Sequence, residues 1–151
     1  MSAFADSSAI VKLYVEEPGS DQARSWTGPW FVSSLAQVEV SAALWRKQRI
    51  DRRRAGDVRL VAEAFRRDLA DLTGEVAMLP VVTTVPIVER ATSLVARHPL
   101  RAYDAIQLAT ALTVRDVAPV GEFLAFDQAL CAAAASEGFD VPFEELLADP
   151  T

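Results

Sequence analysis

The segment from Leu100 to Leu112, LRAYDAIQLATAL, places a carboxylate where a helix normally carries hydrocarbon. At 3.6 residues per turn, Leu108 and Leu112 share a face with Asp104, and small or aliphatic residues cover much of the remaining surface. The pattern predicts a helix that is largely buried. A buried carboxylate is costly unless it is paired, hydrogen-bonded or bound to a metal. Asp104 is therefore a candidate functional residue.

Length and composition predict one globular domain. The chain has 151 residues, of which 51% are apolar, so it can bury a substantial core. We expect a single domain over residues 1–151, with 144–151 as a peripheral tail. No apolar run approaches the roughly 20 residues of a membrane span, and the start of the chain lacks the pattern of a signal peptide. We therefore expect a cytoplasmic protein without a membrane partner.

The single cysteine and the single histidine limit the chemistry. Cys131 excludes an internal disulfide and a cysteine-rich zinc site, and its small-residue surroundings predict a buried packing role. His98 stands beside Pro99, just before the Asp104 helix, so we expect it in a loop or at a helix end. A zinc site or a histidine base remains open, but only His98 could supply it.

Strand-like and helix-like segments alternate along the chain, which is typical of an α/β fold. The predicted strands are Ala3–Ala5, Trp30–Ser33, Val76–Val82, Glu122–Phe126 and a short last strand, Phe139–Val141. The predicted helices are Ser7–Glu16, Ser20–Trp26, Leu35–Gln48, Arg54–Leu72, a helix opened by Thr83 that runs to Arg97, the Asp104 helix, and Gln128–Glu137. Ser34 and Gln37 have the spacing of a capping box for the third helix.

That third helix carries a second carboxylate on an apolar face. Leu35, Ala36 and Ala43 surround Glu39, so Glu39 is expected to point inward. Arg46 lies two turns further along the same face, about 10 Å away by helical rise, where it could meet a phosphate of a bound substrate.

Four acidic residues are thus candidates, and each also has an ordinary structural explanation. Asp6 and Asp127 follow predicted strands and could simply cap the next helix, which is the better explanation for either one alone. Asp104 lies in a first helical turn, where the helix dipole favours negative charge. Glu39 is expected in mid-helix, where neither a cap nor the dipole would satisfy it.

Taken together, the four acids favour a metal site. The carboxyl ends of parallel strands are where such sheets place their ligands. Four carboxylates without an obvious cationic partner would repel one another, and a hard divalent ion such as Mg²⁺ or Mn²⁺ is the natural neutralising agent for an all-oxygen cluster. Such ions activate water and neutralise phosphate charge, so hydrolysis of a phosphodiester is the chemistry that fits best.

Basic residues are concentrated in one region of an acidic chain. The net charge of −6 argues against a protein that coats nucleic acid by bulk electrostatics. Between Arg46 and Arg67, however, nine basic residues face three acidic ones. This run is either a solvated helix face or a track for phosphates. Arg46 and Lys47 are the candidate RNA-binding residues.

The segments FADSSAIVKLYVEEPGS, SSLAQVEVSAALWR, LRAYDAIQLATAL and FLAFDQAL, in this order and spacing, resemble the PIN-domain ribonucleases. The resemblance is closest to the VapC toxins of bacterial toxin–antitoxin pairs and covers nearly the whole chain. It implies a single PIN-like domain with a central parallel sheet of about five short strands flanked by helices on both faces. It also implies that Asp6, Glu39, Asp104 and Asp127 bind the metal, that the protein is a homodimer, and that a small VapB-like antitoxin blocks the site.

One position departs from the family pattern. Many relatives carry Thr or Ser two residues before the last acid, where this chain has Ala125. Ser7 or Ser8 could supply a hydroxyl instead, although helix capping explains either one better. The departure concerns the catalytic rate rather than the class of reaction.

The sequence predicts a Mg²⁺- or Mn²⁺-dependent endoribonuclease that hydrolyses RNA phosphodiesters. Asp6, Glu39 and Asp104 are expected to hold the ion directly or through water, and Asp127 to hold a second ion or orient the attacking water. The alternative is a non-catalytic PIN-like module whose acids bind a partner or a structural ion. A receiver-like phosphoacceptor domain would need a lysine near a late strand end, and the only lysines are Lys12 and Lys47.

Overall fold

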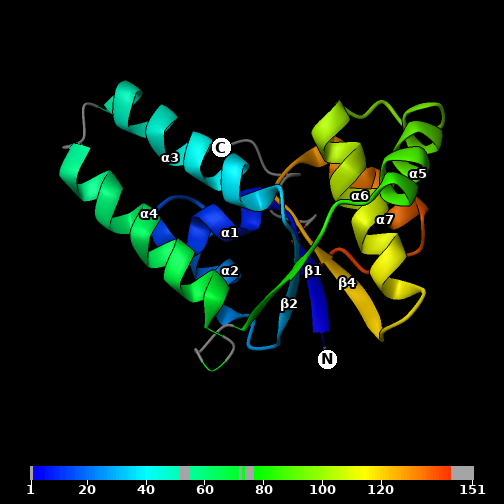
Figure 1. Ribbon diagram of the computed structural model, residues 1–151, viewed down its shortest axis with the longest axis horizontal. Coiled ribbons are helices and arrows are strands. Elements are labelled where there is room, and N and C mark those ends of the chain that lie inside the picture. The colour runs from blue at the N-terminus through cyan, green and yellow to red at the C-terminus, as the bar shows by residue number, and fades with distance from the viewer. Residues whose placement is uncertain (1, 52–54, 72, 74–76, 144–151) are drawn as a thin grey trace.

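The computed structural model describes residues 2–51, 55–71, 73 and 77–143, which form a parallel sheet between two groups of helices (Figure 1). The strands are β1 (Ser2–Ala5), β2 (Trp30–Ser33), β3 (Met78–Val81) and β4 (Val120–Leu124). The helices are α1 (Ser7–Tyr14), α2 (Ser20–Ser25), α3 (Ala36–Asp51), α4 (Ala55–Ala70), α5 (Val85–Val95), α6 (Ala102–Arg115) and α7 (Gln128–Ser136).

The order of the strands determines where a ligand can bind. The sheet has the order β3-β2-β1-β4, and every neighbouring pair is parallel. The chain therefore builds outward from β1 to β3 and then returns to add β4 on the other side of β1. In open α/β sheets, ligands bind at the carboxyl ends of the strands where the direction of building reverses. Here that point lies between β1 and β4.

Alternate side chains of the strands pack against opposite layers of helices. Phe4 belongs to a core that contains Leu94, Leu108 and Leu130 from α5, α6 and α7. Ala3 and Ala5 face the other core, which includes side chains of α1, α3 and α4. Figure 1 shows the two helical groups on either side of the sheet. The predicted α/β fold with helices on both faces is confirmed.

Helix α6 is buried as its apolar sequence predicts. The apolar residues of this helix are at most 2% exposed at four positions: Ala105, Leu108, Ala109 and Leu112. Burial on several sides is the reason that the helix carries few polar residues. Asp104 lies in its first turn and is only partly buried. None of the helices in the described ranges, α6 included, is long and apolar enough to cross a membrane.

The predicted fifth strand is not present among the described residues. Residues 139–141 contribute one isolated bridge, between Glu122 and Asp140. Two backbone hydrogen bonds join Asp140 to β4, from the Phe123 N–H to the Asp140 carbonyl at 2.8 Å and from the Asp140 N–H to the Gly121 carbonyl at 2.9 Å. The ring of Phe139 also packs on Phe123 at 5.7 Å between ring centres, so the segment lies beside β4 without forming a full strand. The predicted peripheral tail, 144–151, lies outside the described residues.

Two boundaries near the acidic residues differ from the prediction. Strand β4 ends at Leu124 rather than Phe126, because the Phe126 N–H donates to the Ser8 hydroxyl at 2.9 Å. Helix α3 begins at Ala36, which places Glu39 in its first turn and not in mid-helix. The helix dipole therefore favours the charge of Glu39, contrary to the expectation from sequence.

The predicted capping box at Ser34 also fails. The Ser34 hydroxyl accepts a hydrogen bond from the Thr83 N–H at 3.3 Å and lies 3.5 Å from the Thr83 hydroxyl. The Ser34 side chain therefore contacts the segment just before α5 and does not cap α3. The Leu35 N–H instead donates to the Ser33 hydroxyl at 3.2 Å.

Candidate functional site

A pocket of about 780 Å³ opens at the carboxyl ends of β1 and β4. Asp6, Glu39, Asp104 and Asp127 all line it. Arg46 and Lys47 line it as well, so the structure brings every predicted site residue into one cavity. What each residue does there remains a prediction.

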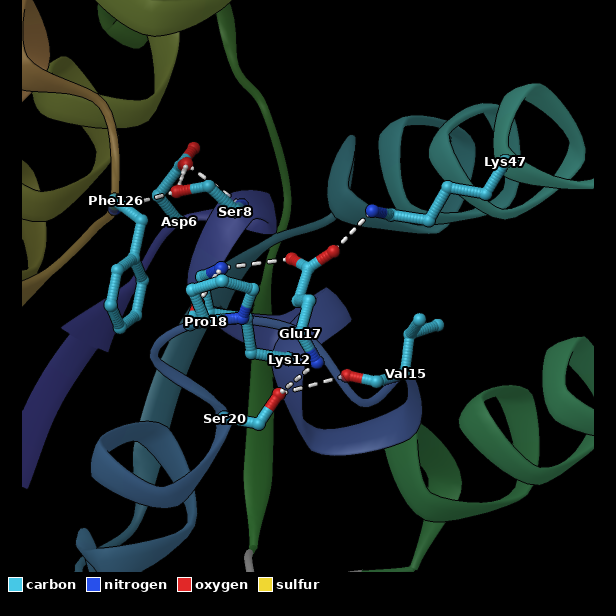
Figure 2. Close-up of polar contacts among 9 residues, drawn as sticks. All are labelled: Asp6, Ser8, Lys12, Val15, Glu17, Pro18, Ser20, Lys47 and Phe126. Carbon is cyan, nitrogen blue, oxygen red and sulfur yellow. Dashed lines mark hydrogen bonds and ion pairs between the residues drawn. The ribbon is translucent and has the colours of Figure 1, made fainter. Parts of the chain in front are cut away.

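Asp6 is held at the end of β1 by the start of α1. Its Oδ2 accepts hydrogen bonds from the Ser8 N–H at 2.9 Å and the Ser8 hydroxyl at 2.6 Å (Figure 2). Burial raises the pKa of Asp6, the hydrogen bonds from Ser8 oppose that rise, and the charge of Asp104 adds to it. Asp6 is therefore the N-cap predicted from the sequence, and it also belongs to the acidic cluster.

Glu39 reaches the same pocket from α3, and a neighbouring helix holds it there. The side-chain amide of Gln107, on α6, donates a hydrogen bond to Glu39 Oε2. Burial and the charge of Asp6 raise the pKa of Glu39 to about 7, whereas the bond from Gln107 opposes the shift.

Asp104 and Asp127 share a cationic partner that was not predicted from the sequence. Arg101 places Nε 3.3 Å from Asp104 Oδ2 and Nη2 3.4 Å from Asp127 Oδ2. Asp127 Oδ1 accepts from the Leu130 N–H at 2.9 Å, so Asp127 caps α7 as predicted. Burial and the charge of Asp127 raise the pKa of Asp104 despite the presence of Arg101.

The chemistry of these four groups fits a hard divalent ion. All the donors are carboxylate oxygens. Burial, and to a smaller extent the charge of neighbouring acids, raises the pKa of Asp6, Glu39 and Asp104, and a nearby positive charge would favour their ionised forms. In the described part of the chain, no three Asp, Glu, His or Cys side chains converge closely enough to hold an ion by themselves. Mg²⁺ commonly keeps several waters and takes only one or two carboxylates, so the set fits an ion held partly through water.

Basic residues of α1 and α3, Lys12 and Lys47, also line the pocket and are linked by shared contacts. Lys12 is only 8% exposed, and its Nζ donates to Glu17 Oε1 at 2.9 Å and to the Pro18 carbonyl at 2.6 Å. Glu17 Oε2 accepts a second ion pair from Lys47, so one carboxylate joins α1 to α3 (Figure 2). Burial alone would raise the pKa of Glu17, but the hydrogen bonds from Lys12 and Lys47 lower it below its usual value.

The rest of the predicted basic run points elsewhere or lies outside the described residues. Arg46 is exposed and lines the pocket beside Lys47. Arg59 and Arg67 are exposed on α4 and do not line it. Residues 52–54 are not described. Among the described residues of the run, Arg46 and Lys47 are therefore the ones that line the pocket and could contact a substrate there.

The other residues singled out from the sequence have structural surroundings. Ala125 is fully buried, and its carbonyl accepts from the Cys131 thiol at 3.3 Å, consistent with a packing role for Cys131. The Ser8 hydroxyl is occupied by Asp6 and Phe126. His98 bonds to Glu137 at 2.7 Å and does not line the pocket, so it does not act there as a base.

Sequence reasoning missed three polar residues of this region: Lys12, Arg101 and Gln107. Gln107 had a usable signal, because it is a polar side chain on an otherwise apolar helix, just as Asp104 is. Arg101 also had a local signal, since it lies three residues before Asp104, and Lys12 lies five residues before its partner Glu17. The contact of Arg101 with Asp127, in contrast, forms only when distant segments meet.

Comparison with known protein families identifies the family of this chain. A family model described as "PIN domain" matches residues 3–136. The chain belongs to the PIN-domain family. The resemblance found in the sequence is thereby confirmed at the level of the family, and no curated protein sequence matches the chain significantly.

Solved structures share the fold of this PIN domain at low sequence identity. A toxin–antitoxin complex from Klebsiella pneumoniae contains a chain that is 20% identical, with a TM-score of 0.59, over 83% of this chain and 87% of that one. The sarcin–ricin loop cleaving toxin VapC20 of Mycobacterium tuberculosis is 18% identical, with a TM-score of 0.64, over 91% and 96%. A protein of Pyrobaculum aerophilum is 16% identical, with a TM-score of 0.65, over 98% and 88%. At these identities the likeness establishes the fold.

Proposed function

We propose that this PIN-domain protein is a divalent-ion-dependent endoribonuclease, acting as the toxin of a bacterial toxin–antitoxin pair. The observation that carries the proposal is the meeting of Asp6, Glu39, Asp104 and Asp127 in one pocket with basic residues on its rim. The acids suit Mg²⁺ or Mn²⁺, and the basic residues suit the phosphates of RNA. The similarity in fold to a toxin that cleaves the sarcin–ricin loop supports the same reaction class.

In the proposed site, Asp6, Glu39 and Asp104 hold the ion, in part through water. A bound divalent ion lowers the pKa of water and neutralises charge on a phosphodiester. Asp127 keeps Oδ1 on the N-terminus of α7. Its Oδ2, which the exposed Arg101 side chain contacts at 3.4 Å, is the oxygen that would orient the attacking water. Arg46 and Lys47 position the substrate by contacting its backbone phosphates.

We also propose a small antitoxin protein as the partner that inhibits the pocket, and a homodimer as the assembled state. The similarity to a chain from a toxin–antitoxin complex supports the first of these. Co-expression with a short neighbouring reading frame tests it, because an antitoxin should co-purify and suppress RNA cleavage. The molar mass in solution, measured by light scattering, tests the dimer.

A non-catalytic PIN-like module is the second candidate. The contacts of Arg101 with Asp104 and Asp127 favour it, because a cation of the protein itself already satisfies two of the four acids. Such a protein would bind an ion or a partner without cleaving RNA. Cleavage assays separate the two functions.

The ion site can be tested by thermal unfolding. At an ion concentration of about 100 times Kd, an ion that binds only the folded state stabilises it by roughly 2.7 kcal/mol. The melting temperature should therefore rise in Mn²⁺ or Mg²⁺ relative to chelator at equal ionic strength. In Asp104→Asn the rise should be much smaller. An equal melting temperature of the wild-type protein with and without ion would contradict the site.

A further inference from the structure

The contact between Gln107 and Glu39 joins the two helices that carry acids of the site. Gln107 is 1% exposed, lies one turn after Asp104 on α6, and donates through Nε2 to Glu39 Oε2 on α3. Its own Oε1 is buried and has no hydrogen-bond partner among the described residues. A buried acceptor left unsatisfied is unfavourable for stability. Stability alone therefore does not explain why an amide is present here.

The chemical type of the donor matters at this position. Glu39 lies beside the like charges of Asp6 and Asp104, and its carboxylate is held against them by hydrogen bonds from the side chains of Gln107 and Ser7. Of these two donors, Gln107 is the one that links Glu39 to the helix of Asp104. A lysine or arginine at position 107 would supply one, but its charge would compete with a divalent ion. The amide of Gln107 holds one oxygen of Glu39 and leaves the negative charge of the carboxylate available.

We infer that Gln107 is a positioning residue for the ion site, which fixes the orientation of Glu39 through a neutral hydrogen bond. This role rests on the proposed ion-dependent function. When a residue that hydrogen-bonds to a metal ligand is removed, metal affinity typically falls by about 10- to 100-fold. Because Gln107 does not line the pocket, it acts only through Glu39.

The test measures Mn²⁺ affinity by calorimetry, together with melting temperature in chelator. Gln107→Met keeps the length of the side chain and removes the donor, so Kd for Mn²⁺ should rise about tenfold or more. The melting temperature in chelator should stay near that of the wild type, because the unsatisfied acceptor is removed together with the donor. In a Glu39→Gln background, Gln107→Met should change Kd no further, since both substitutions act on one interaction.

Thr110→Val is the matched control, because Thr110 is also buried on α6 but donates to the Ile106 carbonyl within its own helix. It should leave Kd unchanged. If the methionine variant does not fold, Gln107→Asn withdraws the amide from Glu39 by one methylene and should weaken binding in the same way. Wild-type affinity in a folded Gln107 variant, with Mn²⁺ binding intact in the wild type, overturns the inference alone. A wild-type protein that binds no Mn²⁺ overturns the proposed ion site and this role together.

Discussion

The guanidinium of Arg101 lies 3.3 Å from Asp104 Oδ2, on a side chain that is 83% exposed. The same group lies 3.4 Å from Asp127 Oδ2. An exposed pair of this kind adds little to stability, because solvent screens it. Because Arg101 pairs with these two carboxylates, it competes with a divalent ion for binding to them.

Arg101→Gln should therefore raise the affinity for a divalent ion. The gain should reach up to about tenfold at low ionic strength and shrink in added salt, since the competing charge acts through solvent. Calorimetric titration with Mn²⁺ at two salt concentrations measures it. Arg97→Gln is the control, because Arg97 pairs with Glu137 and does not line the pocket. Weaker ion binding by Arg101→Gln would contradict the competition.

Reversing the charge at the rim of the pocket should weaken RNA binding. Arg46→Glu and Lys47→Glu, each in an Asp104→Asn background to prevent cleavage, should lower affinity for single-stranded RNA. Each lost phosphate contact should reduce the salt slope by about 0.7. Arg59→Glu makes the same charge change on α4, away from the pocket, and should have a smaller effect. If all three variants lose affinity equally, Arg46 and Lys47 contribute to RNA binding only through the net charge of the protein.

The ion pairs of Glu17 should matter more for stability than an exposed pair nearby. Glu17→Gln leaves the nearly buried ammonium of Lys12 without its carboxylate, so the free energy of unfolding should fall by about 1–3 kcal/mol. Glu16→Gln breaks only an ion pair in which Glu16 is 74% exposed, and should cost less than about 1 kcal/mol. Urea unfolding measures both. Equal losses of unfolding free energy in the two variants would mean that the ion pairs of Glu17 with Lys12 and Lys47 stabilise the protein no more than the exposed pair does.

The stability of the ion-free protein should depend on pH through Glu39. Because the pKa of Glu39 rises from 4.5 to about 7 on folding, the folded state keeps a proton that the unfolded chain has lost between these values. The stability contributed by Glu39 therefore falls as pH rises through this window. Glu39→Gln should gain stability relative to the wild type between pH 5 and pH 7.5, measured by urea unfolding in chelator.

The control for that pH dependence is a substitution of Asp71, an acid whose pKa is lowered in the folded protein. The hydrogen bond from the Thr73 hydroxyl lowers the pKa of Asp71, so Asp71 titrates below this window. Asp71→Asn should therefore differ from the wild type by the same amount at both pH values. If Glu39→Gln behaves in the same way, the pKa of Glu39 is not raised.

Local patterns explain why much of the fold, and the four acids that line the pocket, could be picked out from the sequence. Strand β2 has the bounds predicted for it, because Pro29 precedes its apolar run and Ser33 and Ser34 end that run. Asp6 and Asp127 were found because each comes after an apolar, strand-like run and directly before a helix, where it caps the helix. Asp104 was found because a charge on an apolar helix is conspicuous.

The errors arose where a side chain was engaged by a distant segment. The hydroxyl of Ser34 bonds to Thr83 and not to its own helix, so the predicted capping box does not form. The description of Glu39 as a mid-helix residue was a separate error, because the predicted start at Leu35 already placed it near the first turn. The partner of Glu39 was equally hidden, because Gln107 reaches it only after α3 and α6 have packed at the same edge of the sheet. Hydrophobic periodicity does not encode such contacts.

Cleavage of RNA in Mg²⁺ or in chelator, by the wild type and by Asp104→Asn, tests the proposed activity most directly. A broad set of structured and unstructured RNAs should be cut by the wild type only when the ion is present. Asp104→Asn should lower the rate by at least about 100-fold, as expected when several kcal/mol of ion-supplied stabilisation is lost. Asp6→Asn and Glu39→Gln should lose cleavage as well, while their melting temperatures in chelator equal or exceed that of the wild type. Cleavage by all three variants at the wild-type rate, or cleavage by the wild type that persists in chelator, would contradict an ion-dependent nuclease at these residues.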